Sequence, residues 1–498
     1  MTVTSDQDAL GRPSGLSLLA RRATFGERMW YRYGLLIGPV LGWYLLFDKA
    51  GAYVRVPGTP FYLGECMIVV GITATLWATS YFRLPITREP LLMLLFIFIA
   101  WGAVRAVPQI PKYHTETIRD SALWYYALFA FFFIAATQVD RTLPARLVAL
   151  FRRFVPWLLV WLPIALVASL EKLVSVNVPF SSVPAVTHRT GNLAVAAMIG
   201  LAGVWLLPDP AWSKRKRNLL TLLAIGTILL AGTQGRAGLG AAGIAILVGL
   251  CARFVPHPSR LIGRMALIGV AILVVGLVAS VGVSTARAGR SFSVLQLVEN
   301  VASVGGVSPS NDQGNLSGSI SFRGNLESSI LAKEVDENKF VQGFGFGPNL
   351  AALVGITHQV DQGQVLRSPH NSHVDVLARM GAIGALIWIV FWFGWFRRTW
   401  RAIRRLRNEG FHREQKALEV CFLAVIGILI DCAFDPTLEG AQVAALLWTV
   451  TALGLLLSGR EGAGLLSSSF SNDRPGFWDA LRRGTSAKLP VLASSYED

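Results

Sequence analysis

Apolar blocks about 20 residues long follow one another along most of the chain, separated by short polar segments. A helix of that length crosses the roughly 30 Å hydrocarbon core of a bilayer. Only helices and closed barrels satisfy their backbone inside lipid, and continuous apolar blocks exclude the alternating pattern of a barrel. The chain is also 53% hydrophobic and only 15% charged. These features predict an all-α polytopic membrane protein.

The blocks predict about twelve transmembrane helices, nine within residues 33–281 and three within 374–459. Residues 1–32 precede the first span and lack the apolar region of a cleavable signal peptide, so that span is expected to be an uncleaved anchor. A long polar loop, 282–373, precedes the tenth span, and the polar tail, 460–498, is expected to be disordered. The predicted spans are 33–48, 61–80, 89–106, 122–138, 154–171, 192–207, 218–233, 237–252, 264–281, 374–396, 417–434 and 440–459.

Basic residues predict how the spans are oriented. Most of the 46 Lys and Arg residues fall in alternate connecting segments, on the same side as the N-terminus, as in "SKRKRN" and "RRTWRAIRRLRNEGFHREQK". The positive-inside rule places these segments and both termini in the cytoplasm. The net charge of +16 is therefore interpreted as the topology signal of an inner-membrane protein, and no nucleic-acid partner is expected. The loop 282–373 is then expected on the outer face.

Charged side chains gather at the outer ends of the predicted spans. Arg236 is the sharpest case, since "GTQGRAGLG" leaves almost no loop between two spans. A charge at that depth usually faces a protein interior or a watery cavity, although an Arg can also snorkel to the interface. The other candidates at this face are Arg119, Arg189, Arg323, Asp435 and Glu439.

Guanidinium groups that converge on the outer face would suit a phosphate-bearing ligand. Arg offers planar, bidentate donors that match phosphate geometry, and it keeps its charge at any relevant pH. Taken singly, these residues also allow structural interpretations. Arg119 and Asp120 are adjacent and could form a local salt bridge, and Arg189 and Arg323 could be solvated.

Two histidines precede the tenth span, in "SPHNSHVDVLARMGAIG". A neutral imidazole can accept a proton from an attacking hydroxyl near pH 7. Because residues three apart share a helix face, His370 and His373 are both expected to reach one cavity. The alternative is that one of them caps the helix or packs against its end. A metal site is not expected, because the matching Cys, His or acidic cluster is missing from the sequence around them.

Nucleotide-binding motifs are absent from the sequence. "GFGFGPN" at 343–349 lacks the Lys-Ser/Thr ending of a P-loop and is interpreted as a turn. No cytoplasmic segment is long enough to form a nucleotide-binding domain. An activated donor is therefore expected to reach the outer face already energised, as a lipid pyrophosphate, and no cofactor is expected.

Three features occur in order along residues 30–460. They are "GTQGRAGLGAAGIAILVGL", the single long outer loop, and that loop's end, "FVQGFGFGPN" followed by "SPHNSHVDVLARMGAIGALIWI". In these features the chain resembles the O-antigen ligase and O-antigen polymerase superfamily of bacterial inner-membrane glycosyltransferases. Ligases often have a second His just before the His-Asn motif, where this chain has Pro369.

The resemblance implies a GT-C-like helical fold with a periplasmic cavity beneath the large loop. It implies that a glycan moves from undecaprenyl pyrophosphate to an acceptor hydroxyl. The acceptor is another lipid-linked repeat unit in a polymerase and the lipid A core in a ligase. Membrane lipids and chain-length regulator proteins are the other expected partners, and no metal is implied.

The resemblance also implies roles for the candidate residues. Arg236 and His370 would be catalytic, with His370 as general base for the acceptor hydroxyl. The arginines of the set would hold the donor pyrophosphate, and Asn371 or His373 would orient the base. The expected substrate-binding residues are Arg119, Arg189, Arg323, Asn371, His373, Asp435 and Glu439.

Several functions stay open at this point. A polymerase for O-antigen or exopolysaccharide is favoured over a ligase, because the preceding His of the ligases is absent. A polysaccharide transporter or flippase would also have about twelve spans, but transporters commonly show paired halves, and here the long loop lies only in the second half. A scaffold would explain the spans but not the Arg and His residues.

Overall fold

The computed structural model describes residues 25–56, 61–77, 89–170, 173–254, 263, 283–284, 291–292, 313–356, 359–360, 364–459 and 462–466. These residues are almost entirely helical, which confirms the predicted all-α class for this part of the chain. The described strands form two antiparallel pairs of two residues each: β1 (Val283–Ser284) with β2 (Ser291–Phe292), and β3 (Gln359–Val360) with β4 (Gln364–Val365). Extended segments such as 173–189 make up much of the rest.

A helix lies in eleven of the twelve predicted ranges, and 264–281 lies outside the described residues. The long helices are α2 (Phe25–Ala52), α3 (Leu63–Leu76), α4 (Pro90–Ala106), α8 (Leu128–Val139), α9 (Leu143–Leu170), α10 (Thr190–Leu206), α11 (Lys214–Gln234), α12 (Arg236–Cys251), α15 (Gln313–Asp336), α17 (Ser372–Asn408), α18 (His412–Cys432) and α19 (Ala441–Ser458). The short ones are η1 (Val107–Gln109), α5 (Ile110–Tyr113), α6 (Thr115–Asp120), α7 (Ala122–Tyr125), α16 (Leu350–Leu353) and η3 (Thr437–Glu439).

Several helices have the length and composition of a membrane span. Five qualify: Phe25–Ala52, Pro90–Tyr113, Leu143–Leu170, Ser372–Asn408 and Ala441–Ser458. A bent pair, Thr115–Tyr125 with Leu128–Val139, brings the number to six, and three further apolar helices are shorter. By these criteria the described residues supply five or six of the about twelve predicted spans. The outward face of α17 is apolar, with Leu386 and Phe393 62% and 68% exposed, as expected for contact with lipid.

The bundle is built around α10, which packs against α9, α11, α12 and α18. Nearly every residue from Leu193 to Leu206 is buried, which explains why this helix is apolar on all sides. Small residues allow the neighbours to approach closely: a Cβ on Gly200 would lie 2.7 Å from a Leu159 methyl carbon. This close packing fixes where α10 begins, and that end of the helix contributes to the site described below.

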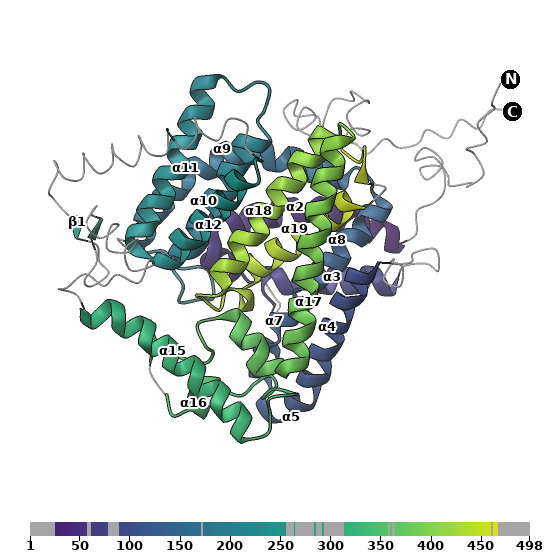
Figure 1. Ribbon diagram of the computed structural model, residues 1–498. Coiled ribbons are helices and arrows are strands. Elements are labelled where there is room, and N and C mark those ends of the chain that lie inside the picture. Colours follow the sequence, from purple (N-terminus) through teal and green to yellow (C-terminus); the bar gives the residue numbers. More distant parts are fainter. Residues whose placement is uncertain are drawn as a thin grey trace, which may run out of the picture.

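The predicted loop 282–373 contains a regular helix. Figure 1 shows α15 lying across one end of the bundle, next to α16 and the beginning of α17. Leu326 and Ile330 of α15 are buried against Leu350, Leu366 and Ala378. The loop prediction missed this 24-residue helix, because only one narrow apolar stripe of α15 is covered by protein.

In three places the ordered structure extends beyond the predicted boundaries. Helix α2 begins at Phe25, inside the segment 1–32 that was expected to precede the first span. Helix α17 continues to Asn408, beyond the predicted end at 396, because its basic second half remains helical. The start of the expected disordered tail is ordered: Leu466 is buried, and its N–H donates to Glu414 Oε1 at 3.1 Å. Residues 467–498 lie outside the described part.

Candidate functional site

Four predicted site residues from separate elements meet at one place. Arg189 precedes α10, and its Nη1 lies 3.0 Å from Asp435 Oδ1 in the connection between α18 and α19. Arg323 of α15 donates from Nη1 to the carbonyl oxygen of Phe434, next to Asp435, at 3.1 Å. His370 lies within electrostatic range of all three charged groups. The structure therefore brings together residues separated by up to 246 positions in sequence.

His370 has the properties of a neutral base. Burial of its ring lowers its pKa below the ordinary value of 6.5. The Asp435 carboxylate opposes this shift, and the guanidinium groups of Arg323 and Arg189 add to it. The result is an imidazole that stays unprotonated at neutral pH, as a base requires.

Arg236 joins this group from α12. It is the first residue of that helix, and Gly235 alone separates α12 from α11, as the sequence predicted. Arg236 is close enough to Arg323 for the two positive charges to interact. Two like charges held this near favour an anion between or beside them.

The beginnings of α10 and α12 lie side by side because glycines replace side chains there. A Cβ on Gly238 would lie 2.6 Å from the Cα of Gly191, and a Cβ on Gly235 would lie 2.5 Å from Thr190 Oγ1. Neither helix has a side-chain cap at its N-terminus. The positive ends of both helix dipoles therefore lie beside Arg189 and Arg236, where they favour negative charge. At α10 the Asp48 and Asp431 carboxylates already lie against this end.

Asn371 and Glu327 are two further polar residues next to His370. Asn371 caps α17, since its Oδ1 accepts from the N–H groups of His373 and Val374 at 3.0 and 3.3 Å. Its side chain also hydrogen-bonds the Glu327 carboxylate. Burial raises the pKa of Glu327, while the Asn371 hydrogen bond and Arg323 lower it. Sequence reasoning missed Glu327. The available signal was its position four residues after Arg323, which places both on one face of α15.

His373 has a structural position, and the expectation that both histidines share one cavity was wrong. His370 precedes the N-cap Asn371, so the two rings are not on one helix face. The His373 Nε2 lies 2.8 Å from the Leu429 carbonyl oxygen, and Trp388 Nε1 donates to Nδ1 at 3.1 Å. Both ring nitrogens are therefore occupied, Nδ1 within α17 and Nε2 in a contact that holds α17 against α18.

Glu439 lies at the inner edge of the site. It lies within electrostatic range of Arg189 and of Asp375 in α17. Asp375 Oδ1 in turn accepts from Arg379 Nε at 2.9 Å, and both of these residues are fully buried. Glu439 thus connects the site to a buried ion network.

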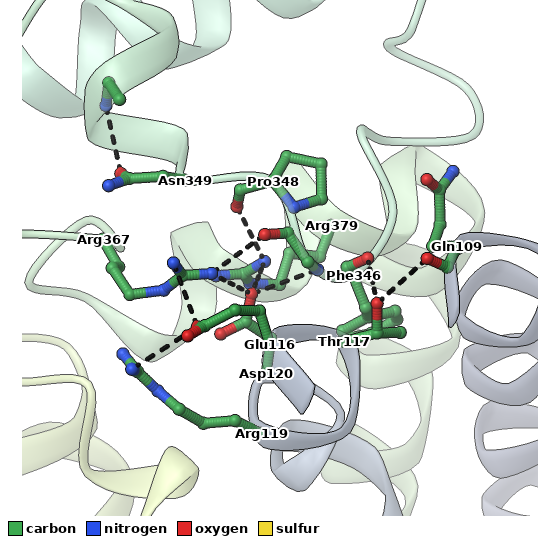
Figure 2. A network of polar contacts seen from close by, with 12 residues as sticks. Gln109, Glu116, Thr117, Arg119, Asp120, Phe346, Pro348, Asn349, Arg367 and Arg379 are labelled. Atoms are coloured by element: carbon green, nitrogen blue, oxygen red, sulfur yellow. Dashed lines mark hydrogen bonds and ion pairs between the residues drawn. The ribbon is translucent and has the colours of Figure 1, made fainter. Parts of the chain in front are cut away.

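Figure 2 shows the centre of that network, in which Asp120 meets two arginines. Its Oδ2 lies 2.8 Å from Arg379 Nη1 and 3.2 Å from Arg367 Nη2. Arg119 instead pairs with Glu116 at 3.5 Å, and its side chain is 56% exposed. The local salt bridge between Arg119 and Asp120 was therefore a wrong interpretation. Asp120 faces the protein interior, where it joins α6 to α17 and to the segment around Arg367.

The glycine-rich stretch 343–349 forms a turn, as predicted. Gly343, Gly345 and Gly347 all have positive φ, of 76°, 81° and 110°. The N–H of Gly345 donates to the Arg379 carbonyl at 3.0 Å, and the N–H of Gly347 donates to Asp120 Oδ2 at 3.1 Å. The turn therefore fixes the start of α17 to α6 and does not form a phosphate loop.

Asp48 anchors the start of α10 from the opposite side. Its carboxylate accepts from the Arg189 N–H and from Asn192 Nδ2, each at 2.7 Å. To reach them, α2 leaves helical geometry at Asp48, with φ 41° and ψ −119°. Sequence reasoning missed this residue, although an Asp near the end of the first apolar block was a signal.

In chemical terms the site combines three guanidinium groups, two helix N-termini, a neutral imidazole and nearby carboxylates. This combination can bind a polyanion and accept a proton beside it. Within the described ranges, no group of three or more His, Cys, Asp or Glu side chains is placed to hold a metal ion. Comparison of the sequence with protein-family models and with curated proteins found no match.

Proposed function

We propose that this chain is a polytopic bacterial inner-membrane glycosyltransferase that moves a glycan from undecaprenyl pyrophosphate to an acceptor sugar hydroxyl. We further propose that it is a polymerase for O-antigen or exopolysaccharide, with about twelve spans, a GT-C-like fold, both termini in the cytoplasm and the site in the periplasm. The observation that carries the proposal is the convergence of Arg189, Arg236, Arg323 and His370 from four separate parts of the chain.

In the proposed reaction the arginines hold the donor pyrophosphate beside the starts of α10 and α12. His370 removes the proton from the acceptor hydroxyl, whose oxygen forms a bond to the anomeric carbon. The bond from that carbon to the phosphate oxygen breaks, and undecaprenyl pyrophosphate leaves. The arginines stabilise the negative charge that develops on the leaving group.

Asp435 would compete with the donor for Arg189. Its carboxylate oxygen Oδ1 lies 3.0 Å from Arg189 Nη1, so an incoming pyrophosphate must displace it from the guanidinium group. Arg323 is held less firmly, by the single carbonyl of Phe434. The donor would therefore engage Arg236 and Arg323 first and displace Asp435 from Arg189 last.

The test is complementation of a deletion in the host with the wild type, Arg236→Ala or His370→Ala. Arg401→Ala and His412→Ala serve as matched controls, because both side chains are exposed and lie near the far end of α17 and the start of α18. Surface polysaccharide length and the lipid-linked pool are read on gels, alongside the amount of protein in the membrane. The polymerase proposal expects single repeat units on the lipid A core for both site variants and normal chains for both controls.

Two other results would redirect the proposal. Full-length chains that accumulate on undecaprenyl pyrophosphate would identify a ligase, the other member of the same enzyme class. Full complementation by both site variants would reject the catalytic roles of Arg236 and His370 and favour a transporter or scaffold.

A further inference from the structure

A small cavity with several polar side chains in a largely apolar lining lies in the bundle, near the Arg189–Asp435 pair. Its volume is about 30 Å³, and it is lined by residues of α2, α9, α10, α18 and α19 and of the segment before α10. A cavity needs roughly 10–15 Å³ of such volume to hold one water, so this cavity has room for one or two small molecules or ions. Its polar lining consists of Tyr44, Asp48, His188, Asn192, Asp431 and Gln442.

Five of these six side chains carry a buried polar atom that has no hydrogen-bond partner among the described residues. Asp431 is 2% exposed, and His188 and Gln442 are each 7% exposed. The Tyr44 hydroxyl lies toward Gly64 and Glu65 of α3. Because buried polar atoms are nearly always paired, the other four indicate that a ligand belongs in the cavity. The atoms are Tyr44 Oη, His188 Nδ1, Asn192 Oδ1, Asp431 Oδ1 and Gln442 Oε1.

Four of the five atoms present lone pairs. The His188 Nε2 lies 2.9 Å from the Leu46 carbonyl oxygen, which only accepts, so Nε2 carries the hydrogen and Nδ1 is bare. Asn192 donates its amide to Asp48, which leaves Oδ1 facing the cavity. The oxygens of Asp431 and Gln442 are acceptors by their chemistry. The ligand must therefore be positively charged or a donor.

Charge favours a cation. The Asp431 carboxylate sits against the start of α10, where a Cβ on Gly191 would lie 2.4 Å from its Oδ1. The nearby cation Arg189 is paired with Asp435, and Asp48 already accepts from Arg189 and Asn192. In the described part of the chain, Asp431 forms no ion pair. Asp431 lies within electrostatic range of Arg189 but is not directly paired with it. A buried carboxylate without a direct counter-ion is costly, so Asp431 must either bind a cation or take up a proton.

The backbone beside the cavity is also interrupted. Helix α2 breaks its helical geometry at Asp48, which lines the cavity. In membrane transporters, the unwound backbone and the C-terminal ends of interrupted helices coordinate monovalent cations. Hard cations prefer oxygen ligands, which Asp431, Asn192 and Gln442 supply. We propose that this cavity binds Na⁺, held chiefly by Asp431. The proposal does not depend on the glycosyltransferase function.

The test uses the purified full-length protein in lipid nanodiscs at pH 7.5 and constant ionic strength. Choline chloride is replaced stepwise by NaCl or by KCl, and Tm is followed by tryptophan fluorescence. A ligand that binds only the folded state raises Tm in a saturable way, so NaCl is expected to raise Tm to a plateau and KCl to raise it less. Asp431→Asn should abolish the rise. Asp209→Asn should retain it, because Asp209 pairs with Arg152 at 3.8 Å and does not line the cavity.

A second measurement keeps the proposal falsifiable if Asp431→Asn does not fold. Binding of ²²Na⁺ to the wild-type protein, competed by unlabelled NaCl but not by choline chloride, should reach one ion per chain. A Tm that is the same in NaCl and choline chloride, together with no ²²Na⁺ binding, would overturn the proposal and leave a cavity filled by water. A Tm that rises on acidification and never responds to NaCl would also overturn it, because a proton would then neutralise Asp431.

Discussion

Arg189 and Asp435 form an ion pair at 3.0 Å across 246 residues of sequence. The pair joins the start of α10 to the connection between α18 and α19. Asp435 is held in place in turn by Ser372, whose Oγ donates to the Asp435 carbonyl at 3.1 Å. Asp435 thus contacts the start of α10 through its carboxylate and the start of α17 through its backbone carbonyl. Its carboxylate pairs with the guanidinium group that the proposed donor needs.

Asp435→Asn should therefore strengthen donor binding. The amide keeps the shape of the side chain but removes the charge that competes with pyrophosphate for Arg189. We expect KM for the lipid-linked donor to fall several-fold, since a charge-assisted hydrogen bond is worth about 1.5–3 kcal/mol and the amide retains part of it. Steady-state kinetics on the purified protein measure this. An unchanged or higher KM would show that Asp435 binds the substrate and does not compete with it.

The rate should depend on pH through His370. Its pKa lies below 6.5 because of burial, with Asp435 opposing and the two arginines adding to the shift. A general base works when neutral, so kcat/KM should rise as pH increases through this lowered pKa and level off at neutral pH. Asp435→Asn removes the charge that favours the imidazolium, so the rise should move to lower pH. Profiles of kcat/KM against pH for the wild type and for Asp435→Asn measure the two midpoints. A midpoint that is the same in both proteins would contradict this account.

Glu327 should act as a positioning residue for Asn371 and His370. Glu327→Gln retains a hydrogen-bonding side chain toward Asn371, whereas Glu327→Ala removes it. A hydrogen bond of this kind is worth about 0.5–1.5 kcal/mol, which is roughly a threefold to tenfold loss of kcat in the alanine variant. The glutamine variant should stay near wild type. An equally large loss in both would instead assign the Glu327 charge a direct role.

Gly343→Ala should destabilise the protein strongly. Gly343 has φ 76°, and an added Cβ would lie 2.5 Å from the backbone carbon of Arg379. Gly355 is a matched control, since its φ is 78° but no atom lies within 4 Å of an added Cβ. Left-handed strain alone costs about 1–2 kcal/mol, so Gly355→Ala should lower Tm slightly. Gly343→Ala should lower it much more, and equal shifts in the two variants would show that the turn yields to the added methyl group.

The buried network should contribute far more to stability than the exposed pair beside it. Arg379→Ala would leave Asp120 and Asp375 without their shared partner, at a cost of about 3–5 kcal/mol. Arg119→Ala removes only a half-exposed pair with Glu116, at a cost of about 0–1 kcal/mol. Thermal unfolding in detergent compares the two variants. A small effect of Arg379→Ala would mean that the carboxylates are protonated in the wild type.

The sequence by itself determined most of the long helices, but not α15, and it indicated which residues to consider for the candidate site. Apolar length and the distribution of basic residues are properties that can be read along the chain, so most helix ranges and the position of Arg236 between two helices followed from them. The turn at 343–349 followed as well, because glycine chemistry is local.

Only the tertiary structure decided which charged groups meet. His370 and His373 are three residues apart, yet one faces Asp435 and the other holds Leu429 and Trp388. Asp120 turns away from its neighbour Arg119 toward Arg379. The cavity around Asp431 has no sequence signature at all, because its lining comes from five helices. These contacts depend on how helices that are far apart in sequence pack together. That packing cannot be inferred from residue spacing or from the hydrophobic pattern.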